Sequence, residues 1–276
     1  MTTEAFAPAK INLTLHITGQ RVDGYHLLDS LVVFADIGDR LWFAAGPEMA
    51  LDVTGPFAAG VPADQRNLVW QAAQAAGLTG HIRIEKNLPH GAGLGGGSAD
   101  AAALLRATFG DDVTRGIGLD TALALGADVP VCLHAGPQRM QGIGEVLHRV
   151  WPVPGYAVVL VNPRVPVPTG PIFAALETKA NPPMSDIPVS ADPVAFARWM
   201  GTQRNDLERP ATHMVPVIGA VLRTFDGALL ARMSGSGATC FGLYADDAQA
   251  AAAAQGISAA HPDWWVVSGR TMGARP

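Results

Sequence analysis

The segment Leu88–Leu105, LPHGAGLGGGSADAAALL, places a dense run of glycines directly before an alanine-rich run. Glycine loses more conformational freedom on folding than any other residue, so this density indicates a backbone that turns sharply or lies close to another group. The residues that follow favour helix, and Ser98 is a suitable N-cap. The segment therefore predicts a glycine-rich loop that ends at the N-terminus of a helix.

A loop in this position has the chemistry of an anion site. Unpaired backbone N–H groups and the positive end of the helix dipole face the same way at a helix N-terminus, which favours a bound phosphate. The alternative is a mobile surface loop before an ordinary helix, but plain linkers seldom run into a helix without polar spacers. We expect a phosphate group to bind here.

Other motifs fit the segment poorly. Gly91, Gly93 and Gly96 match the GxGxxG pattern of dinucleotide binding. The strand expected before them, however, alternates apolar and charged residues, unlike a buried parallel strand. No Gly-Lys-Ser/Thr of a Walker A loop follows, and Asp100 stands where a GxSxG elbow needs glycine. The histidines are scattered without the spacing of zinc ligands.

The composition is that of a globular protein without a general affinity for polyanions. The chain has 276 residues, of which 49% are hydrophobic and 16% charged, enough for two domains with their own cores. A net charge of −5 gives no attraction to nucleic acid or to an anionic membrane surface. We therefore expect small-molecule partners only, and the sequence carries no signal for the oligomeric state.

Cysteine usage and the apolar runs indicate a cytoplasmic location. Cys132 and Cys240 have no CxxC spacing, so a reduced compartment fits and both are expected to be packing residues. The N-terminus lacks the pattern of a signal peptide, and runs such as Tyr156–Val161 are far too short to span a bilayer.

Hydrophobic periodicity places the elements of the first half. Apolar residues alternate with polar ones over Ile11–Ile17, which predicts a strand with Lys10 and Asn12 on its polar face. Pro130 is expected to stop a helix over 119–125 and to leave Asp128 at its end or in the turn beyond. Further strands are expected at 27–35, 41–44, 49–53, 81–86, 130–134 and 145–150, and a further helix at 67–77.

A cluster of prolines near Trp151–Gly155 predicts a boundary between domains 1–154 and 155–276. The second half is expected to hold strands at 156–161, 228–233, 239–244 and 264–268, and helices at 171–178, 193–201, 213–225 and 246–255. Strands and helices interleave without a strict βαβ cadence, which favours an α+β fold. The loop Ser234–Ala238 is by itself typical of a hairpin turn, and beside the first loop it is a candidate second part of the same ligand site.

The chain resembles the GHMP kinase superfamily, and the resemblance covers nearly its whole length. The three motifs of that superfamily are matched in order by PAKINL at 8–13, by PHGAGLGGGSADAA at 89–102 and by MSGSGA at 233–238. The segments GQRVDGYH at 19–26, GADVPV at 126–131, PTGPIF at 168–173 and NDLE at 205–208 point to the member that acts on a methylerythritol unit carried on cytidine diphosphate.

The resemblance implies a two-domain fold, with an N-terminal ATP-binding domain like ribosomal protein S5 and a C-terminal ferredoxin-like domain. It also implies ATP-dependent phosphorylation of the 2-hydroxyl of methylerythritol in the non-mevalonate isoprenoid pathway. Another GHMP kinase acting on mevalonate, homoserine or a sugar is the first alternative. A catalytically idle nucleotide-binding module is the second.

Phosphoryl transfer needs positioning, neutralisation of phosphate charge and a group that takes the hydroxyl proton. With the resemblance, Asp128 is the candidate base and Lys10 the residue that orients it, whereas each taken alone reads as an ordinary surface residue. The residues expected to bind ATP are Pro89, Gly91, Gly93, Leu94, Gly95, Gly96, Gly97, Ser98 and Ala99. Those expected to bind the substrate are Asn12, Tyr25, His26, Thr169 and Phe173. Magnesium is expected with ATP, and no carboxylate is assigned to it.

Overall fold

The computed structural model describes residues 2–110 and 113–273, which form two compact units. Of the described residues, the first unit contains 2–10, 38–90, 95–110 and 113–135, and the second contains 11–37, 91–94 and 136–273. The strands β1 (Thr2–Asn12) and β3 (His26–Ala45) each pass from one unit into the other. The glycine-rich segment does the same, because residues 91–94 belong to the second unit.

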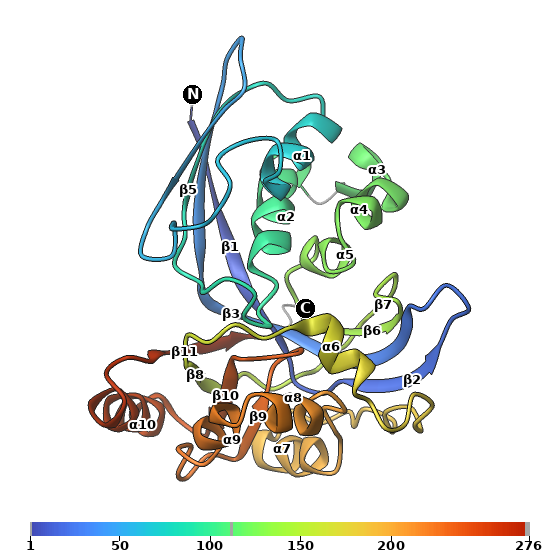
Figure 1. Cartoon of the computed structure of the whole chain (residues 1–276), viewed down its shortest axis with the longest axis vertical. Coiled ribbons are helices and arrows are strands. Elements are labelled where there is room, and N and C mark those ends of the chain that lie inside the picture. Colours follow the sequence, from blue (N-terminus) through green and yellow to red (C-terminus); the bar gives the residue numbers. More distant parts are fainter. Residues whose placement is uncertain (1, 111–112, 274–276) are drawn as a thin grey trace. The chain divides into compact units, whose positions relative to one another are not determined.

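The first unit is a small sheet covered by helices. In sheet order, β4 (Ala50–Thr54) pairs in parallel with β5 (Gly80–Glu85), and β5 pairs antiparallel with the second half of β3. The helices are α1 (Leu68–Ala75), α2 (Gly96–Phe109), α3 (Val113–Ile117), α4 (Leu119–Leu125) and α5 (Val129–Cys132). Figure 1 shows these helices gathered on one side of β1, β3 and β5, with α1 and α5 both packed on α2.

The second unit contains a four-stranded antiparallel sheet with the strand order β11-β8-β10-β9. These strands are β8 (Ala157–Asn162), β9 (Leu230–Met233), β10 (Cys240–Tyr244) and β11 (Trp265–Met272). The helices that follow β8 are α6 (Thr169–Ala174), α7 (Pro193–Gly201), α8 (Glu208–Met214) and α9 (Val217–Leu222). With α10 (Asp247–Ala260) before β11, this order gives the β-α-β-β-α-β pattern of a ferredoxin-like fold.

The strands β8 and β10 are buried along their whole length and form the core of this sheet. The helices α7, α9 and α10 pack against the sheet, as Figure 1 shows for the orange and red part of the chain. The start of β3 also belongs to this unit, where it pairs with β2 (His16–Gln20), with β6 (Gln138–Gly142) and with the end of β11. The strand β6 pairs in turn with β7 (Val146–Arg149). The α+β prediction is confirmed.

Three predicted strands near the start of the chain differ from the structure. The strand expected over Ile11–Ile17 is interrupted, because the amide N–H groups of Leu13 and Thr14 both donate to the Leu31 carbonyl, and the Thr14 hydroxyl accepts from the Leu31 amide. This side-chain bond takes the place of a regular backbone bond to β3, at the point where β1 has ended and β2 has not yet begun. The strands expected at 27–35 and 41–44 form one strand, β3.

The strand expected at 130–134 is wrong, because those residues belong mainly to α5. Proline in the first turn of a helix loses no hydrogen bond and its φ suits the helix, so Pro130 starts this helix rather than extending a strand. Asp128 lies beyond the end of α4, where it was predicted, and it is the N-cap residue of α5.

Two predictions about helices were also wrong. The N-cap of α2 is Gly95 and not Ser98, which lies in the first turn of the helix. The helix expected over 213–225 is replaced by α8 and α9, because Pro216 disfavours helical backbone at Val215. The remaining expected helices and strands are present within a few residues of their predicted bounds.

Candidate active site

The N-terminus of α2 presents backbone amides that no side chain caps. Gly95 adopts the left-handed conformation, with φ of 63°, which glycine alone reaches without steric cost. The first intrahelical bond runs from the Ala99 amide to the Gly95 carbonyl, so the amides before Ala99 in this turn have no partner within the helix. Such a terminus has the geometry and the dipole to bind a phosphate group.

Gly95 also lets a lysine pass close to this terminus. A β-carbon at residue 95 would lie 3.2 Å from Cε of Lys10, which is tighter than ordinary contact. Lys10 is buried, with 5% of its side chain exposed, and its Nζ donates to Oδ2 of Asp128 at 2.8 Å. The structure thus joins the predicted base and its predicted partner, which are 118 residues apart in the sequence.

Asp128 remains accessible to a reactant. Its side chain is 36% exposed and makes no capping hydrogen bond to α5, although Asp128 is the N-cap residue of that helix. Behind it, α5 is fully buried, and burial raises the pKa of the Cys132 thiol to about 12, with Asp128 adding to the shift. Cys132 and Cys240 are both buried and free, so the prediction that they are packing residues is confirmed.

A buried charge cluster lies beneath the ends of the glycine-rich segment in the first unit. Lys86 donates to Oδ2 of Asp39 and, at 2.5 Å, to Oδ2 of Asp100. Each of the three side chains is at most 4% exposed. We call these three residues the clip. Asp100 has one oxygen, Oδ1, with no hydrogen-bond partner among the described residues.

The charges of the clip are uneven, since one ammonium faces two carboxylates. Burial raises the pKa of Asp100 to about 8; Lys86 opposes this shift and Asp39 adds to it. Burial also opposes the charge on Lys86, but the two carboxylates outweigh it and raise the pKa of that ammonium. Both shifts favour the protonated form of the group concerned.

The part of the glycine-rich segment in the second unit is fastened to the loop between β9 and β10. The Ser234 hydroxyl donates to the Gly93 carbonyl at 2.9 Å, and the Thr239 amide donates to the Ala92 carbonyl. A side chain at residue 93 would collide with the Ser234 carbonyl oxygen. The loop between β9 and β10 is a hairpin connection, as predicted, and it also holds residues 92–93.

Three of the predicted substrate residues make specific contacts in the second unit. The rings of His26 and Phe173 lie 4.8 Å apart between centroids. Burial lowers the pKa of His26, with Lys179 adding to the effect, and its buried Nε2 has no hydrogen-bond partner among the described residues. The Thr169 hydroxyl lies 2.9 Å from the Ser236 hydroxyl. An imidazole with a free nitrogen, beside an aromatic ring that is tilted by 33° to it, suits a heterocyclic base.

The other two predicted substrate residues differ in their surroundings. Asn12 is buried, its Nδ2 donates to the Ser30 hydroxyl at 2.8 Å, and its Oδ1 lacks a partner among the described residues. Tyr25 is 59% exposed and supplies a free ring face at the surface. Of the predicted ATP residues, Pro89, Leu94 and Ala99 have buried side chains, so they offer a ligand only their backbone.

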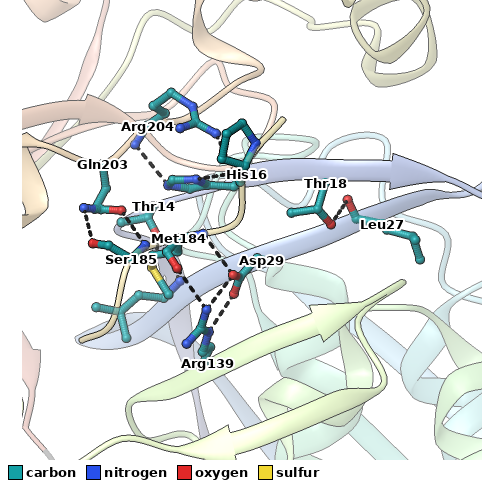
Figure 2. Close-up of polar contacts among 12 residues, drawn as sticks. Thr14, His16, Thr18, Leu27, Asp29, Arg139, Met184, Ser185, Gln203 and Arg204 are labelled. Carbon is teal, nitrogen blue, oxygen red and sulfur yellow. Dashed lines mark hydrogen bonds and ion pairs between the residues drawn. The ribbon is translucent and has the colours of Figure 1, made fainter. Parts of the chain in front are cut away.

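A second buried ion pair lies in the second unit, and Figure 2 shows its contacts. Arg139 donates to both oxygens of Asp29, at 2.8 and 2.7 Å, and the Met184 amide donates to Oδ2 at 3.0 Å. The Thr14 hydroxyl contacts the sulfur of Met184. These bonds hold the irregular segment around Met184 against β3.

His16, also in Figure 2, holds the same segment from β2. Its Nε2 accepts the Arg204 amide at 3.2 Å, and its Nδ1 lies 3.4 Å from the Pro182 carbonyl oxygen. These contacts require a neutral ring that carries its proton on Nδ1. Burial lowers the pKa of His16, and Arg204 adds to this effect.

Sequence reasoning did not single out the clip, and it named Ser234 only as part of the loop Ser234–Ala238. The signal for the clip was Asp100, a charged residue inside the apolar run of α2, together with Lys86 at the end of an alternating strand. A carboxylate in a buried helix face needs a cationic partner. Its identity was not readable, because Asp39 and Lys86 reach it only through the fold.

Known proteins resemble this chain over its whole length. The family models described as GHMP kinases N terminal domain and GHMP kinases C terminal match residues 67–136 and 188–263. A crystal structure of homoserine kinase from Cytophaga hutchinsonii shares the fold, with a TM-score of 0.68 at 17% identity over 99% of this chain and 95% of that one. The fold, the uncapped glycine-rich helix start and the family models define a GHMP kinase.

Nearer relatives narrow the assignment. The 4-diphosphocytidyl-2-C-methyl-D-erythritol kinase of Dinoroseobacter shibae is 58% identical over 95% of this chain and 92% of its own length. That of Cereibacter sphaeroides is 52% identical over 98% and 100%. A crystal structure of 4-(cytidine 5'-diphospho)-2C-methyl-D-erythritol kinase superposes with a TM-score of 0.78 at 34% identity, covering 98% and 100%. The chain belongs to the family of 4-diphosphocytidyl-2-C-methyl-D-erythritol kinases.

Proposed function

We propose that the protein transfers the terminal phosphate of ATP to the 2-hydroxyl of 4-diphosphocytidyl-2-C-methyl-D-erythritol. The relatives that bear the name of this activity cover nearly the whole chain, at 58% identity in the first case. The observation that carries the chemistry is the contact of 2.8 Å between Lys10 and Asp128 in the first unit. It supplies a carboxylate to take the hydroxyl proton and a cation to stabilise the charge that develops.

In this proposal the backbone of Gly91–Ala99 binds the ATP phosphates, since the start of α2 has amides without partners inside the helix. Asp128 accepts the proton as the hydroxyl oxygen attacks the terminal phosphorus and the bond to ADP breaks. Lys10, fixed beside it, orients the carboxylate and draws electron density from the attacking oxygen.

The substrate is assigned to residues of the second unit. The neighbouring His26 and Phe173 rings, with Tyr25, suit the cytosine, and the free Nε2 of His26 suits its hydrogen-bonding edge. Asn12, through its unpaired Oδ1, suits a hydroxyl of the polyol, and Thr169 suits the polyol or its diphosphate.

Magnesium is part of the proposal because it neutralises phosphate charge and is held largely by the phosphates themselves, with one or two carboxylates. Across residues 2–110 and 113–273, no group of three or more His, Cys, Asp or Glu side chains is placed to hold a metal ion. No protein ligand of the ion is assigned.

The division into domains 1–154 and 155–276 and the cytoplasmic location stay predictions. None of the helices in the described ranges has the length and apolar character needed to cross a membrane.

The test is an assay of ADP release with ATP and a panel of acceptors that contains the cytidine compound, mevalonate, homoserine and sugars. We expect turnover with the cytidine compound, and preference for another acceptor would refute the substrate assignment. Asp128→Asn should lower kcat by about 10²–10⁴-fold, the usual contribution of a general base, with ATP binding retained. Asp120→Asn, an exposed carboxylate in the first turn of α4, is the matched control and should leave kcat unchanged.

A further inference from the structure

Both ends of the glycine-rich segment are joined to the clip within the first unit. Oδ1 of Asp39 accepts hydrogen bonds from the backbone amides of Asn87 and Leu88, at 2.5 and 2.9 Å. These two residues directly precede the glycine-rich loop. Asp100 lies in the second turn of α2, the helix into which the segment leads. Lys86 links the two carboxylates, so one buried cation holds both ends.

The start of α2 lies directly over this cation. A β-carbon at Gly96 would lie 3.6 Å from Nζ of Lys86, 3.7 Å from Oδ2 of Asp39 and 3.8 Å from Cβ of Leu88. Gly96, the first residue of α2, therefore packs against the clip. A displacement of the clip would displace the backbone amides at the start of α2.

The composition of the clip is unusual for a purely structural contact. A buried ion pair is rarely more stable than apolar residues of the same volume, because desolvation offsets the attraction. Here one lysine faces two carboxylates, one of which keeps an oxygen without a hydrogen bond in the described structure. The clip therefore adds little to stability, but it fixes both ends of the loop. Fixed ends are what a loop needs if it is to bind a ligand in one conformation.

We propose that Lys86, Asp39 and Asp100 are positioning residues for the nucleotide: they hold the glycine-rich segment in the conformation that binds the phosphates of ATP. None of them touches the ligand. This inference rests on the proposed function of the segment as the ATP phosphate site, and it assigns to the clip the preorganisation of that site.

The experiment compares Asp39→Ala, Asp100→Ala and Asp100→Asn with the wild type. Asp39→Ala removes the acceptor of both leading amides, and Asp100→Ala removes the link to α2. Each should raise KM for ATP by about tenfold, the factor that one lost hydrogen bond to a charged group gives. The KM for the cytidine compound and kcat at saturating substrates should change much less.

Asp100→Asn is the conservative variant. Its amide oxygen still accepts from Lys86 with the same shape, so the link to α2 stays in place and KM for ATP should stay within about twofold of the wild type. The matched control is Asp29→Ala, which removes an equally buried carboxylate from the ion pair in the second unit. It should leave KM for ATP unchanged.

Equal KM values for ATP in Asp39→Ala, Asp100→Ala and Asp29→Ala would overturn the proposal, provided that circular dichroism shows all three folded. If Asp39→Ala does not fold, the contrast between Asp100→Ala and Asp100→Asn decides. Calorimetric titration with ATP and magnesium separates this inference from the proposed function: it measures nucleotide affinity even if the cytidine compound is not phosphorylated.

Discussion

The clip in the first unit and the Asp29–Arg139 pair in the second are both buried, yet they satisfy their carboxylates differently. Asp29 receives two bonds from one guanidinium and a third from the Met184 amide, so a single charge is matched by a single countercharge (Figure 2). In the clip one ammonium serves two carboxylates, and Asp100 keeps an oxygen without a partner in the described structure.

The difference follows from the shapes of the cations. A guanidinium presents a planar fork that fits one carboxylate bidentately, whereas a lysine ammonium is a point donor that reaches several acceptors. The fork suits a fixed segment such as that around Met184. The lysine ammonium suits a place where two separate chain segments bind one nitrogen atom, as Asp39 and Asp100 bind Nζ of Lys86 in the clip.

The largest expected effect is the loss of the shared cation. Lys86→Met should lower the free energy of unfolding by about 3–5 kcal/mol, as removal of one partner of a buried ion pair leaves uncompensated charge. Arg139→Met, which leaves Asp29 with the Met184 amide, should cost about 1.5–3 kcal/mol, the range for lost hydrogen bonds to a charged group. Urea denaturation measures both, and equal losses would contradict the contrast between the two clusters.

The second expected effect is a pH dependence that belongs to Asp100. Its pKa is about 8 in the folded protein and 3.8 as its ordinary value, so the folded state binds the extra proton between these values. The free energy of unfolding should therefore fall as pH rises from about 4 towards 8. In Asp100→Asn this contribution should be absent.

Two of the groups that interact with Asp100 titrate above that window. Lys86 has a raised pKa, and burial raises the pKa of the Cys132 thiol to about 12. The measurement is the difference in free energy of unfolding between wild type and Asp100→Asn from pH 5 to 9. A difference that is constant with pH would show that Asp100 is ionised throughout.

The smallest expected effect concerns His16, beside the Asp29–Arg139 pair. Its folded pKa is lowered, so the unfolded chain binds the proton first, and stability should be lost as pH falls through 6.5. Burial and Arg204 disfavour the charged ring, while the Pro182 carbonyl, Asp206 and Asp29 oppose them, which keeps the effect small.

His16→Gln removes this titration and should flatten the acid side of the stability profile between pH 6.5 and 5, as measured by thermal melting. His213→Gln, an exposed histidine at the end of α8, is the matched control. An unchanged profile in His16→Gln would refute the assignment of the acid loss to His16.

Much of the fold was readable because hydrophobic periodicity is a local property. The bounds of α7 agree with prediction to the residue, since Asp192 and Pro193 give its start unambiguously. Errors arose where tertiary contacts overruled local preference. Thr14 broke a predicted strand through a bond to Leu31, and Pro130 began a short helix where apolar residues predicted a strand.

The residues proposed for the site were found by motif and resemblance, and the structure brings Lys10 to Asp128 and His26 to Phe173. It does not bury Tyr25, and it gives Pro89, Leu94 and Ala99 packing positions. The clip was missed as a functional cluster because its members are 14 and 47 residues apart along the chain and meet only in the fold.

The sequence by itself determined the kind of helix start that binds a phosphate, since glycine backbone freedom and the helix dipole are properties of neighbouring residues. Only the tertiary structure decided which charges meet. Lys10 pairs with Asp128, and Lys86 pairs with Asp39 and Asp100, because the fold packs together chain segments that are distant in sequence. A buried charge is stable only beside its partner, and that partner is chosen by the fold.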